Sequence, residues 1–265
     1  MSTNQKVRYE EMLPHEVVQA RENRPVAYVP VGGLEWHGEH NVLGLDTVKI
    51  HALAMECAKH DGGLVFPPLF YGEPREHYLM EANFDPGDLI KQSMRLPAQN
   101  FQAGYMEERR TETDLRYIQF LLYMLKEAHS LGFKVMVLMP GHYPLLAHAR
   151  AAVELFNLHV DKAGLELNQA ISWAAVGFEL VRDVFPKAGD HAGAWETSLM
   201  LALRPDLVDL SVLSNDCEVK LVAVWGQDPR KHASIEYGQQ AVKLIVERIT
   251  VKVGELLKGL GLPTL

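Results

Sequence analysis

Acidic and histidine side chains are concentrated in the stretch "LEWHGEHNVLGLD", residues 34–46, which follows a strand-like run. Glu35 and His37 are two positions apart, so in an extended chain both side chains point to the same side. Asp46 ends the stretch, and a carboxylate that bridges two metal ions holds them roughly 3.5–4 Å apart. Such a pair of ions makes hydroxide available near neutral pH, and that hydroxide normally serves hydrolysis.

Two further turns carry side chains of the same types. His142 lies between Gly141 and Tyr143 after a second strand-like run, and His191 and Glu196 lie in a turn that leads into a helix. In an open α/β sheet, ligands bind beyond the carboxyl ends of the strands, where such turns gather. We therefore expect the three turns to converge. Imidazoles and carboxylates without a thiolate form a ligand set that suits Zn²⁺, Mn²⁺ or Fe²⁺.

Each of these side chains also has a purely structural interpretation. Asp46 can be the N-cap of a helix, and Glu196 can be the acid of a first helical turn with His191 as its neighbour. The clustering of the polar residues, rather than any one of them, favours the metal site. Six other histidines are interpreted as solvent-exposed or core-packed, namely His40, His51, His60, His129, His148 and His159.

The elements that position these turns alternate between strands and helices. Short apolar runs bounded by Gly or Pro predict strands at residues 24–33, 63–70 and 134–139, and a fourth within 170–180. The alternation predicts an α/β fold with a mostly parallel sheet that helices cover on both faces. Helices are predicted after Asp46 and within residues 114–131, 145–164, 190–203 and 233–259.

The composition, 48% hydrophobic and 23% charged, is that of an ordinary globular protein of 265 residues. Because the sequence has no repeats and no obvious linker, we predict one domain over residues 1–265. A net charge of -8 argues against a nucleic-acid partner. The cysteines, Cys57 and Cys217, imply neither a disulfide framework nor a Cys-based zinc site. The start lacks a leader-like apolar segment, and no apolar stretch approaches the roughly 20 residues of a membrane span. We expect a cytoplasmic protein without a membrane partner.

Four ordered motifs resemble those of the creatininase family of creatinine amidohydrolases. The first is "VPVGGLEWHGEHNVLGLDT" (29–47), which is similar to the family's opening signature. The others are "YGEPREH" (71–77), "VLMPGHYP" (137–144) and "HAGAWETS" (191–198). Together they extend the resemblance over roughly residues 20 to 205.

The resemblance implies a three-layer α/β/α sandwich with a two-metal site that hydrolyses a carbon–nitrogen bond of a cyclic or simple amide. By position, Glu35 and His142 would bind one ion and His37 the other, with Asp46 between them. Glu196 would add a carboxylate ligand or orient the water. His191 would pass a proton to the leaving nitrogen, and the two divalent ions, Zn²⁺, Mn²⁺ or Fe²⁺, would polarise the carbonyl.

Two prolines depart from the family pattern. Pro140 stands where the family has Asn, and Pro144 occupies the place of a carboxylate that helps to hold the second metal in creatininase itself. Either Glu196 replaces that carboxylate or the second site is weak. Tyr143 keeps the creatininase-like residue.

The substrate is expected to be a small-molecule amide, with a creatinine-like lactam as the leading hypothesis. Tyr143 and His77 are assigned to substrate binding, and Trp36 and Trp195 are candidates for an aromatic wall unless they are core or interface residues. Alternatives are a formamide or small-peptide amide hydrolase of the same family, or a non-catalytic oligomeric relative. The resemblance also suggests a homo-oligomer, commonly a hexamer.

Overall fold

Four short strands form a parallel sheet at the centre of the fold. The computed structural model describes residues 6–72, 80–83, 85, 88–102, 105, 110–162 and 170–263. Within this part of the chain the strands lie in the order β2, β1, β3, β4, and each neighbouring pair is parallel. The strands are β1 (Val26–Val31), β2 (Leu64–Val65), β3 (Val135–Pro140) and β4 (Ile171–Ala174).

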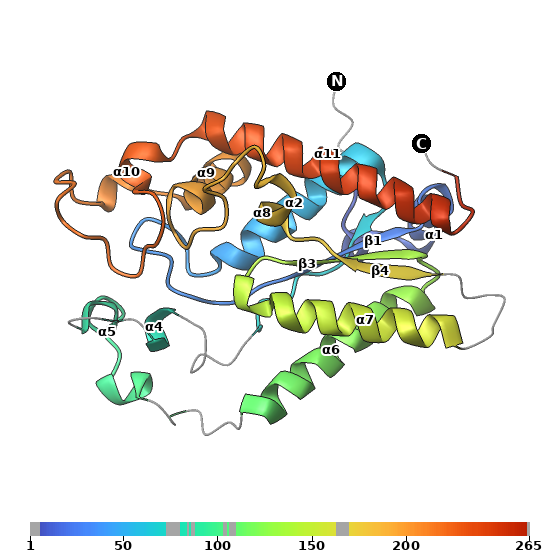
Figure 1. Ribbon diagram of the computed structural model, residues 1–265, viewed down its shortest axis with the longest axis horizontal. Coiled ribbons are helices and arrows are strands. Elements are labelled where there is room, and N and C mark those ends of the chain that lie inside the picture. Colours follow the sequence, from blue (N-terminus) through green and yellow to red (C-terminus); the bar gives the residue numbers. More distant parts are fainter. Residues whose placement is uncertain are drawn as a thin grey trace.

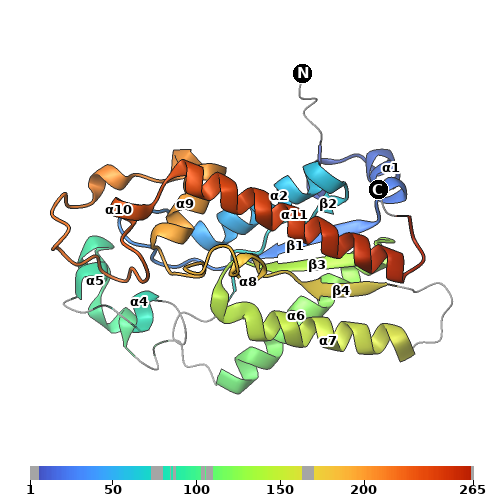
Figure 2. The same ribbon diagram turned by 45° about the horizontal axis from the view of Figure 1, so that its top comes forward.

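Helices cover both faces of this sheet (Figures 1 and 2). On one face, Tyr28 of β1 and Val137 of β3 share a hydrophobic core with helices α2, α8, α9 and α11. On the other face, Val29 and Leu138 share a second core with α6 and α7. The predicted three-layer α/β/α sandwich is thereby confirmed. The covering helices are α2 (Leu45–Asp61), α6 (Arg110–Ser130), α7 (Leu146–Lys162), α8 (Gly177–Val181), α9 (Ala194–Leu203) and α11 (Ile235–Gly259).

Shorter elements lie around the sandwich. Helix α1 packs Val17 and Ala20 against the second core, next to β2. The remaining described helices are α1 (Pro14–Asn23), α4 (Met80–Asn83), α5 (Leu89–Ser93) and α10 (Pro229–His232), with 3₁₀ turns at Tyr9–Glu11, Ala98–Phe101, Tyr143–Leu145, Pro205–Leu207 and Leu210–Val212.

Two predicted elements differ from the observed ones in length. The strand predicted at 63–70 is limited to Leu64–Val65, because Pro67 and Pro68 cannot donate ladder hydrogen bonds. The last strand ends at Ala174, and Gly177–Val181 is a short helix. The tail, by contrast, is one continuous helix despite its β-branched residues, because the spacing of its buried side chains keeps one face of α11 in the core.

The order of the strands fixes where ligands gather. The chain passes from β1 to β2 on one side and then to β3 on the other, so the topological switch point lies between β1 and β3. Open α/β sheets bind their ligands at this point, beyond the carboxyl ends of the strands. The loops that follow Val31 and Pro140 both begin there.

Two observations bear on the compartment and partner expectations. None of the helices in the described ranges combines the length and the apolar character needed to cross a membrane. Cys57 and Cys217 are both free thiols.

Candidate metal centre

The three polar turns converge at the switch point. Glu35 Oε2 from the loop after β1 lies 3.1 Å from Nδ1 of His142, which follows β3. His37 Nε2 lies 3.7 Å from Glu196 Oε2 on the first turn of α9. All four side chains are buried. The prediction that the turns meet agrees with this geometry, although Glu35 and His142 are 107 positions apart in sequence and His142 and His191 are 49 apart.

Six side chains form three overlapping groups that are each able to hold a metal ion. Within every group the candidate ligand atoms lie within 4.8 Å of one another. Around one ion with bonds of about 2.0–2.2 Å, ligand atoms are spaced by roughly 3–4 Å, so this spacing suits coordination. The groups are Glu35, Asp46 and His142; His37, Asp46 and Glu196; and Glu35, His37 and His191.

Asp46 joins the first two groups through its two oxygens. Asp46 Oδ2 lies 2.9 Å from His142 Nδ1, and Oδ1 lies 3.3 Å from His37 Nε2. A carboxylate that presents one oxygen to each of two neighbouring groups has the arrangement of a bridging ligand.

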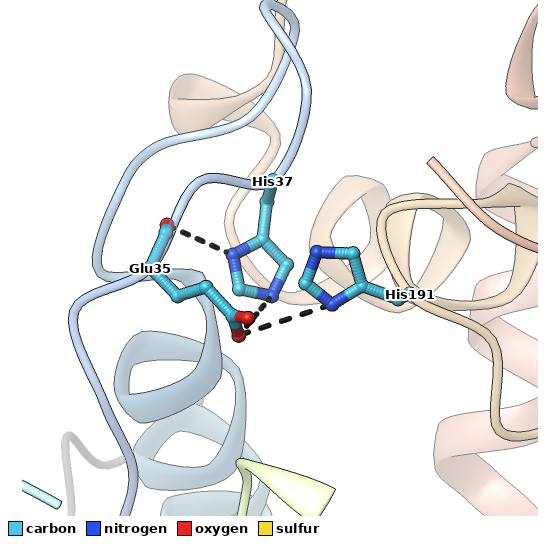
Figure 3. A group of neighbouring side chains, drawn as sticks. All are labelled: Glu35, His37 and His191. Carbon is cyan, nitrogen blue, oxygen red and sulfur yellow. Dashed lines mark hydrogen bonds and ion pairs between the residues drawn. The ribbon is translucent and has the colours of Figure 1, made fainter. Parts of the chain in front are cut away.

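Backbone carbonyls set the orientation of two imidazoles. His37 Nδ1 donates a hydrogen bond to the carbonyl oxygen of Glu35 (3.1 Å), and His191 Nε2 donates to the carbonyl of Trp36 (3.0 Å). Each ring therefore turns its other nitrogen toward Glu35 Oε2, at 4.0 Å for His37 and 3.9 Å for His191 (Figure 3). Holding the ring through its other nitrogen is the usual way in which proteins orient metal-binding or proton-transferring histidines.

Close backbone packing brings Asp46 beside His142. A Cβ atom on Gly141 would collide with the backbone carbonyl of Asp46, so glycine permits the end of β3 to approach the first turn of α2. Asp46 is not the N-cap of α2, because the helix begins at Leu45 and Gly44 occupies the cap position. Its carboxylate faces His37 and His142 instead.

The loop before α9 is held in a strained conformation. Ala192 has a φ of 55°, a left-handed value that costs a non-glycine residue about 1–3 kcal/mol. Its amide donates to Glu196 Oε2 (2.9 Å). Asp190 accepts hydrogen bonds from the amides of Trp195 (2.8 Å) and Glu196 (3.1 Å), which fixes the loop to the helix. These contacts position His191 and Glu196 toward the centre.

The charges of the site are strongly coupled. Burial opposes protonation of His37, but Asp46, Glu196 and Glu35 outweigh it and raise its pKa to about 9. Burial likewise opposes the charge on Asp46, whose pKa is nevertheless held well below the usual value by His37 and the buried Lys49. Burial and the neighbouring His37 lower the pKa of His191. The three carboxylates outnumber the cationic groups beside them, Lys49 and a protonated His37, so the pocket favours a further cation.

The residues present fit divalent metal ions. Two buried ligand atoms, Glu35 Oε2 and His37 Nε2, make no hydrogen bond of acceptable geometry within the described structure. A buried polar atom without a hydrogen bond costs about 1–3 kcal/mol, and metal coordination satisfies it. Carboxylates with imidazoles are the donor set that Zn²⁺ and Mn²⁺ accept.

A cavity of about 610 Å³ opens over the centre. Tyr143 and Pro144 form part of its wall, and Trp225 lies at the same cavity with 54% of its surface exposed. Its described lining residues are Glu35, Asp46, Met80, His142, Tyr143, Pro144, Pro186, Lys187, Ala188, Gly189, Asp190, His191, Glu196, Trp225 and Gly226.

The aromatic wall proposed from Trp36 and Trp195 is not found at this cavity, since neither residue is among its described lining. Trp195 packs against Phe185 and Tyr237 in the first core, and Trp36 packs with Met80 in a smaller cluster. Both side chains are buried. His77, the other residue assigned to substrate, lies outside the described residues.

Three residues at the centre escaped the sequence analysis. Lys49 lies one helical turn after Asp46, a spacing that puts both side chains on one face of α2. Asp190 directly precedes His191, and its role follows only from its contacts with backbone amides. Trp225 reaches the cavity through a bridge between its backbone and that of His191. Only Lys49 had a signal in the sequence, namely its spacing from Asp46.

His40 has the structural role that the sequence analysis favoured for it. The ring is buried, and Nε2 donates to the carbonyl oxygen of Ala192 (3.1 Å). Burial lowers the pKa of His40 from 6.5 to about 4. Above pH 6.5 both folded and unfolded chains hold the neutral ring, whereas between pH 6.5 and 4 only the unfolded chain binds the proton. His40 therefore makes the fold less stable as the pH falls through this window.

We expect His40→Gln to weaken this pH dependence, because glutamine can still donate a hydrogen bond but does not titrate. Between pH 7.5 and 5.0, the free energy of unfolding of the wild type should fall by about 2 kcal/mol more than that of His40→Gln. Urea denaturation at both pH values measures the difference. Equal pH dependence in the two proteins would contradict the buried neutral state of His40.

Comparisons with known proteins identify proteins that are similar to this chain. The sequence model of the creatininase family, described as creatinine amidohydrolase, matches residues 10–90 and 113–252. The creatinine amidohydrolase of Pseudomonas putida is 27% identical over 194 residues, which are 70% of this chain and 66% of that protein. The matched region thus spans just under two thirds of that relative.

Solved structures of creatininases have the same fold. A mutant creatininase of Zn-Zn type superposes with a TM-score of 0.66 at 23% identity, and a Mn form does so with a TM-score of 0.66 at 22% identity. Each comparison covers 95% of this chain and 98% of the other. At this level of identity, the structural likeness supports the fold. The relatives hold Zn or Mn, and this chain has acidic and histidine groups able to bind such ions.

Proposed function

The chain belongs to the creatininase family, and from this premise we propose that it hydrolyses a carbon–nitrogen bond of a small cyclic amide, a creatinine-like lactam, at a centre of two divalent metal ions. Membership of the family makes the protein a hydrolase that acts on carbon–nitrogen bonds. The observation that carries the proposal is the convergence of three carboxylates and three imidazoles in overlapping groups of ligands beneath one cavity, with Asp46 common to two of these groups. We treat residues 1–265 as one functional domain.

The proposed ligand assignment follows the groups. Glu35 and His142 hold one ion, His37 and Glu196 hold the other, and Asp46 lies between them. When bound, divalent ions lower the pKa of water and polarise a carbonyl oxygen, which is the chemistry that amide hydrolysis needs.

His191 is proposed to move the proton to the leaving nitrogen. Its Nε2 proton is held by the carbonyl of Trp36, so Nδ1 is the nitrogen that accepts and returns a proton at the centre. The lowered pKa of His191 keeps the ring neutral near pH 7, as an acceptor of the proton requires. Protonation of the nitrogen is needed because an amide anion is a poor leaving group.

The wall of the cavity suits a small, flat substrate. Tyr143 and Trp225 offer aromatic surface, and Pro144 and Pro186 offer apolar surface that limits access of bulk water. Tyr143 is fixed by edge-to-face contact with Phe178, at 4.7 Å between ring centroids. Tyr143 and Trp225 are therefore the residues that we assign to substrate orientation, and His77 keeps its proposed role.

Trp225→Ala is expected to raise KM about tenfold while kcat changes little, because loss of an aromatic contact removes roughly 1.4 kcal/mol of substrate binding. The backbone bridge to His191 does not depend on the side chain and should persist. Trp225→Phe retains an aromatic face and should keep most of the affinity. Steady-state kinetics of both variants test the assignment, and an unchanged KM in Trp225→Ala would refute it.

Metal analysis followed by a substrate panel tests the proposed function. Protein purified without chelator is analysed by elemental mass spectrometry and then assayed against creatinine, other lactams and formamides. Bound divalent metal with lactam hydrolysis supports the proposal, and formamide hydrolysis alone would favour the sibling activity. A chain that binds no metal after incubation with Zn²⁺ or Mn²⁺ would instead be a non-catalytic relative.

We also propose a homo-oligomer, with the hexamer suggested by the family resemblance. Helix α6 exposes three large apolar side chains, Leu115, Phe120 and Tyr123, with 45–59% of their surface accessible. The rings of Phe120 and Tyr123 stack with 6.5 Å between their centroids. Exposed apolar surface of this kind favours a protein contact. Light scattering coupled to size exclusion tests the assembly, and a monomer at micromolar concentration would refute it.

A further inference from the structure

A buried ammonium group lies within the proposed metal centre. Lys49 of α2 is 4% exposed, and its Nζ forms a hydrogen bond with Glu196 Oε1 and lies 3.4 Å from Asp46 Oδ1. The ammonium also lies 5.1 Å from the centre of the Tyr143 ring, close enough for a cation–π contact. Carboxylates and an aromatic face therefore hold this charge at a defined position.

Lys49 contacts the Asp46 oxygen that is directed toward only one of the two groups that share Asp46. It meets Asp46 Oδ1 and Glu196, which belong to the group completed by His37. The other group uses Asp46 Oδ2, which faces His142, whereas the ion pairs of Lys49 are with Asp46 Oδ1 and Glu196 Oε1. The two metal subsites thus differ in electrostatic environment.

The ammonium reduces the negative charge available to an ion at its subsite. The carboxylates of Asp46 and Glu196 carry two negative charges, and Lys49 neutralises one of them at hydrogen-bonding distance. Pro144 lines the same cavity, and its side chain has no atom that can bind a metal. A divalent ion that used Asp46 Oδ1 and Glu196 as ligands would have to bind against electrostatic repulsion from the ammonium or displace it.

We propose that the Lys49 ammonium is an internal cation of the His37–Asp46–Glu196 subsite and competes there with a divalent ion, so that the chain binds its two ions with unequal affinity. The ion at Glu35, Asp46 and His142 binds first and tightly. The second ion binds only when the flexible Lys49 side chain withdraws from Glu196. This inference rests on the proposed two-metal centre and adds a residue that controls the occupancy of that centre.

The test compares Zn²⁺ and Mn²⁺ binding by the wild type and Lys49→Met, a variant of similar length without the charge. After equilibration at a series of buffered free-ion concentrations, elemental mass spectrometry gives the number of ions per chain. We expect the dissociation constant of the second ion from the wild type to be at least about 100-fold higher than that of the first. In Lys49→Met, binding of the second ion should tighten at least about tenfold while the first is unchanged.

Lys59→Met is the matched control. Lys59 lies on the same helix and pairs with Glu56 three residues before it (2.8 Å), just as Lys49 pairs with Asp46, but its side chain is half-exposed and remote from the centre. Its binding curve should coincide with that of the wild type. Because Lys49→Met leaves two buried carboxylates without their cation, Lys49→Gln, which keeps a hydrogen-bond donor, is measured beside it. Either variant is expected to gain more thermal stability from added ion than the wild type does.

The outcomes separate this inference from the proposed function. The proposed competition between Lys49 and the second ion would be overturned if the wild type bound both ions with equal affinity. It would also be overturned if both Lys49 variants bound the second ion as weakly as the wild type or more weakly. Either result would leave the metal centre intact. No binding by the wild type or by either Lys49 variant would overturn the proposed centre itself, and the inference with it.

Discussion

Asp46→Ala is expected to lose most of its bound metal and nearly all amidohydrolase activity. Asp46 is the residue that contributes to both the Glu35–His142 and the His37–Glu196 group, with one oxygen directed at each. Removal of a partner that only orients a ligand typically costs 10–100-fold in metal affinity, so loss of a shared ligand should cost at least about 100-fold. Elemental mass spectrometry after exhaustive dialysis measures the loss, and kcat/KM should fall in parallel.

His60→Ala serves as the control for Asp46→Ala. His60 lies on the same helix α2, is exposed, and belongs to none of the metal-binding groups found in the described residues. Its metal content and activity should equal those of the wild type. Metal retained at the wild-type level by Asp46→Ala would rule out the bridging role and leave Asp46 as a structural residue of the first turn of α2.

His191→Ala is expected to keep its metal and to lose turnover. General acid–base catalysis by a positioned side chain contributes about 10²–10⁴-fold, and kcat should fall by that factor while metal content stays near that of the wild type. The reason lies in its position. The centre of the His191 ring lies 4.4 Å from that of His37, and His191, which lines the cavity, is the only one of the six candidate ligands that is not fully buried.

Two measurements distinguish this role from metal binding. Imidazole added to His191→Ala should restore part of the turnover, since a free base can enter the space left by the side chain. The plot of log kcat against pH should also lose the limb that belongs to the wild-type imidazole. If His191→Ala instead loses an ion, His191 is a ligand in the group of Glu35 and His37, and another group must protonate the leaving nitrogen.

The fold was accessible from the sequence because its signals are local. Uninterrupted burial of β1 and β3 follows from their runs of Val, Leu and Met, and the stripes of α2, α6 and α11 follow from apolar residues at helical spacing. Where the local sequence signal was weaker, the predicted length of the element was wrong, as for the strand predicted at 63–70. Prolines there interrupt the pairing after Val65, and it resumes only as a single bridge between Leu69 and Val31, although the residues remain apolar.

The candidate ligands were accessible for a related reason. Strand ends of a parallel sheet share one edge, so side chains such as Glu35 and His142 that follow two strands are brought together by topology alone. Their assignment to particular ions remains a prediction, as do the proton transfer by His191 and the roles of Tyr143 and His77.

The sequence by itself determined the α/β/α architecture and the set of carboxylates and imidazoles that meet at the switch point, since both depend on periodicity and on the position of residues relative to strand ends. Only the tertiary structure decided that Lys49 enters the centre, that Asp190 holds the loop of His191, and that Trp225 rather than Trp195 reaches the cavity. The spacing of Lys49 from Asp46 puts both side chains on one face of α2, but it does not specify the contact with Glu196. Contacts between elements depend on the direction of individual side chains across packed layers, which spacing along the chain does not specify.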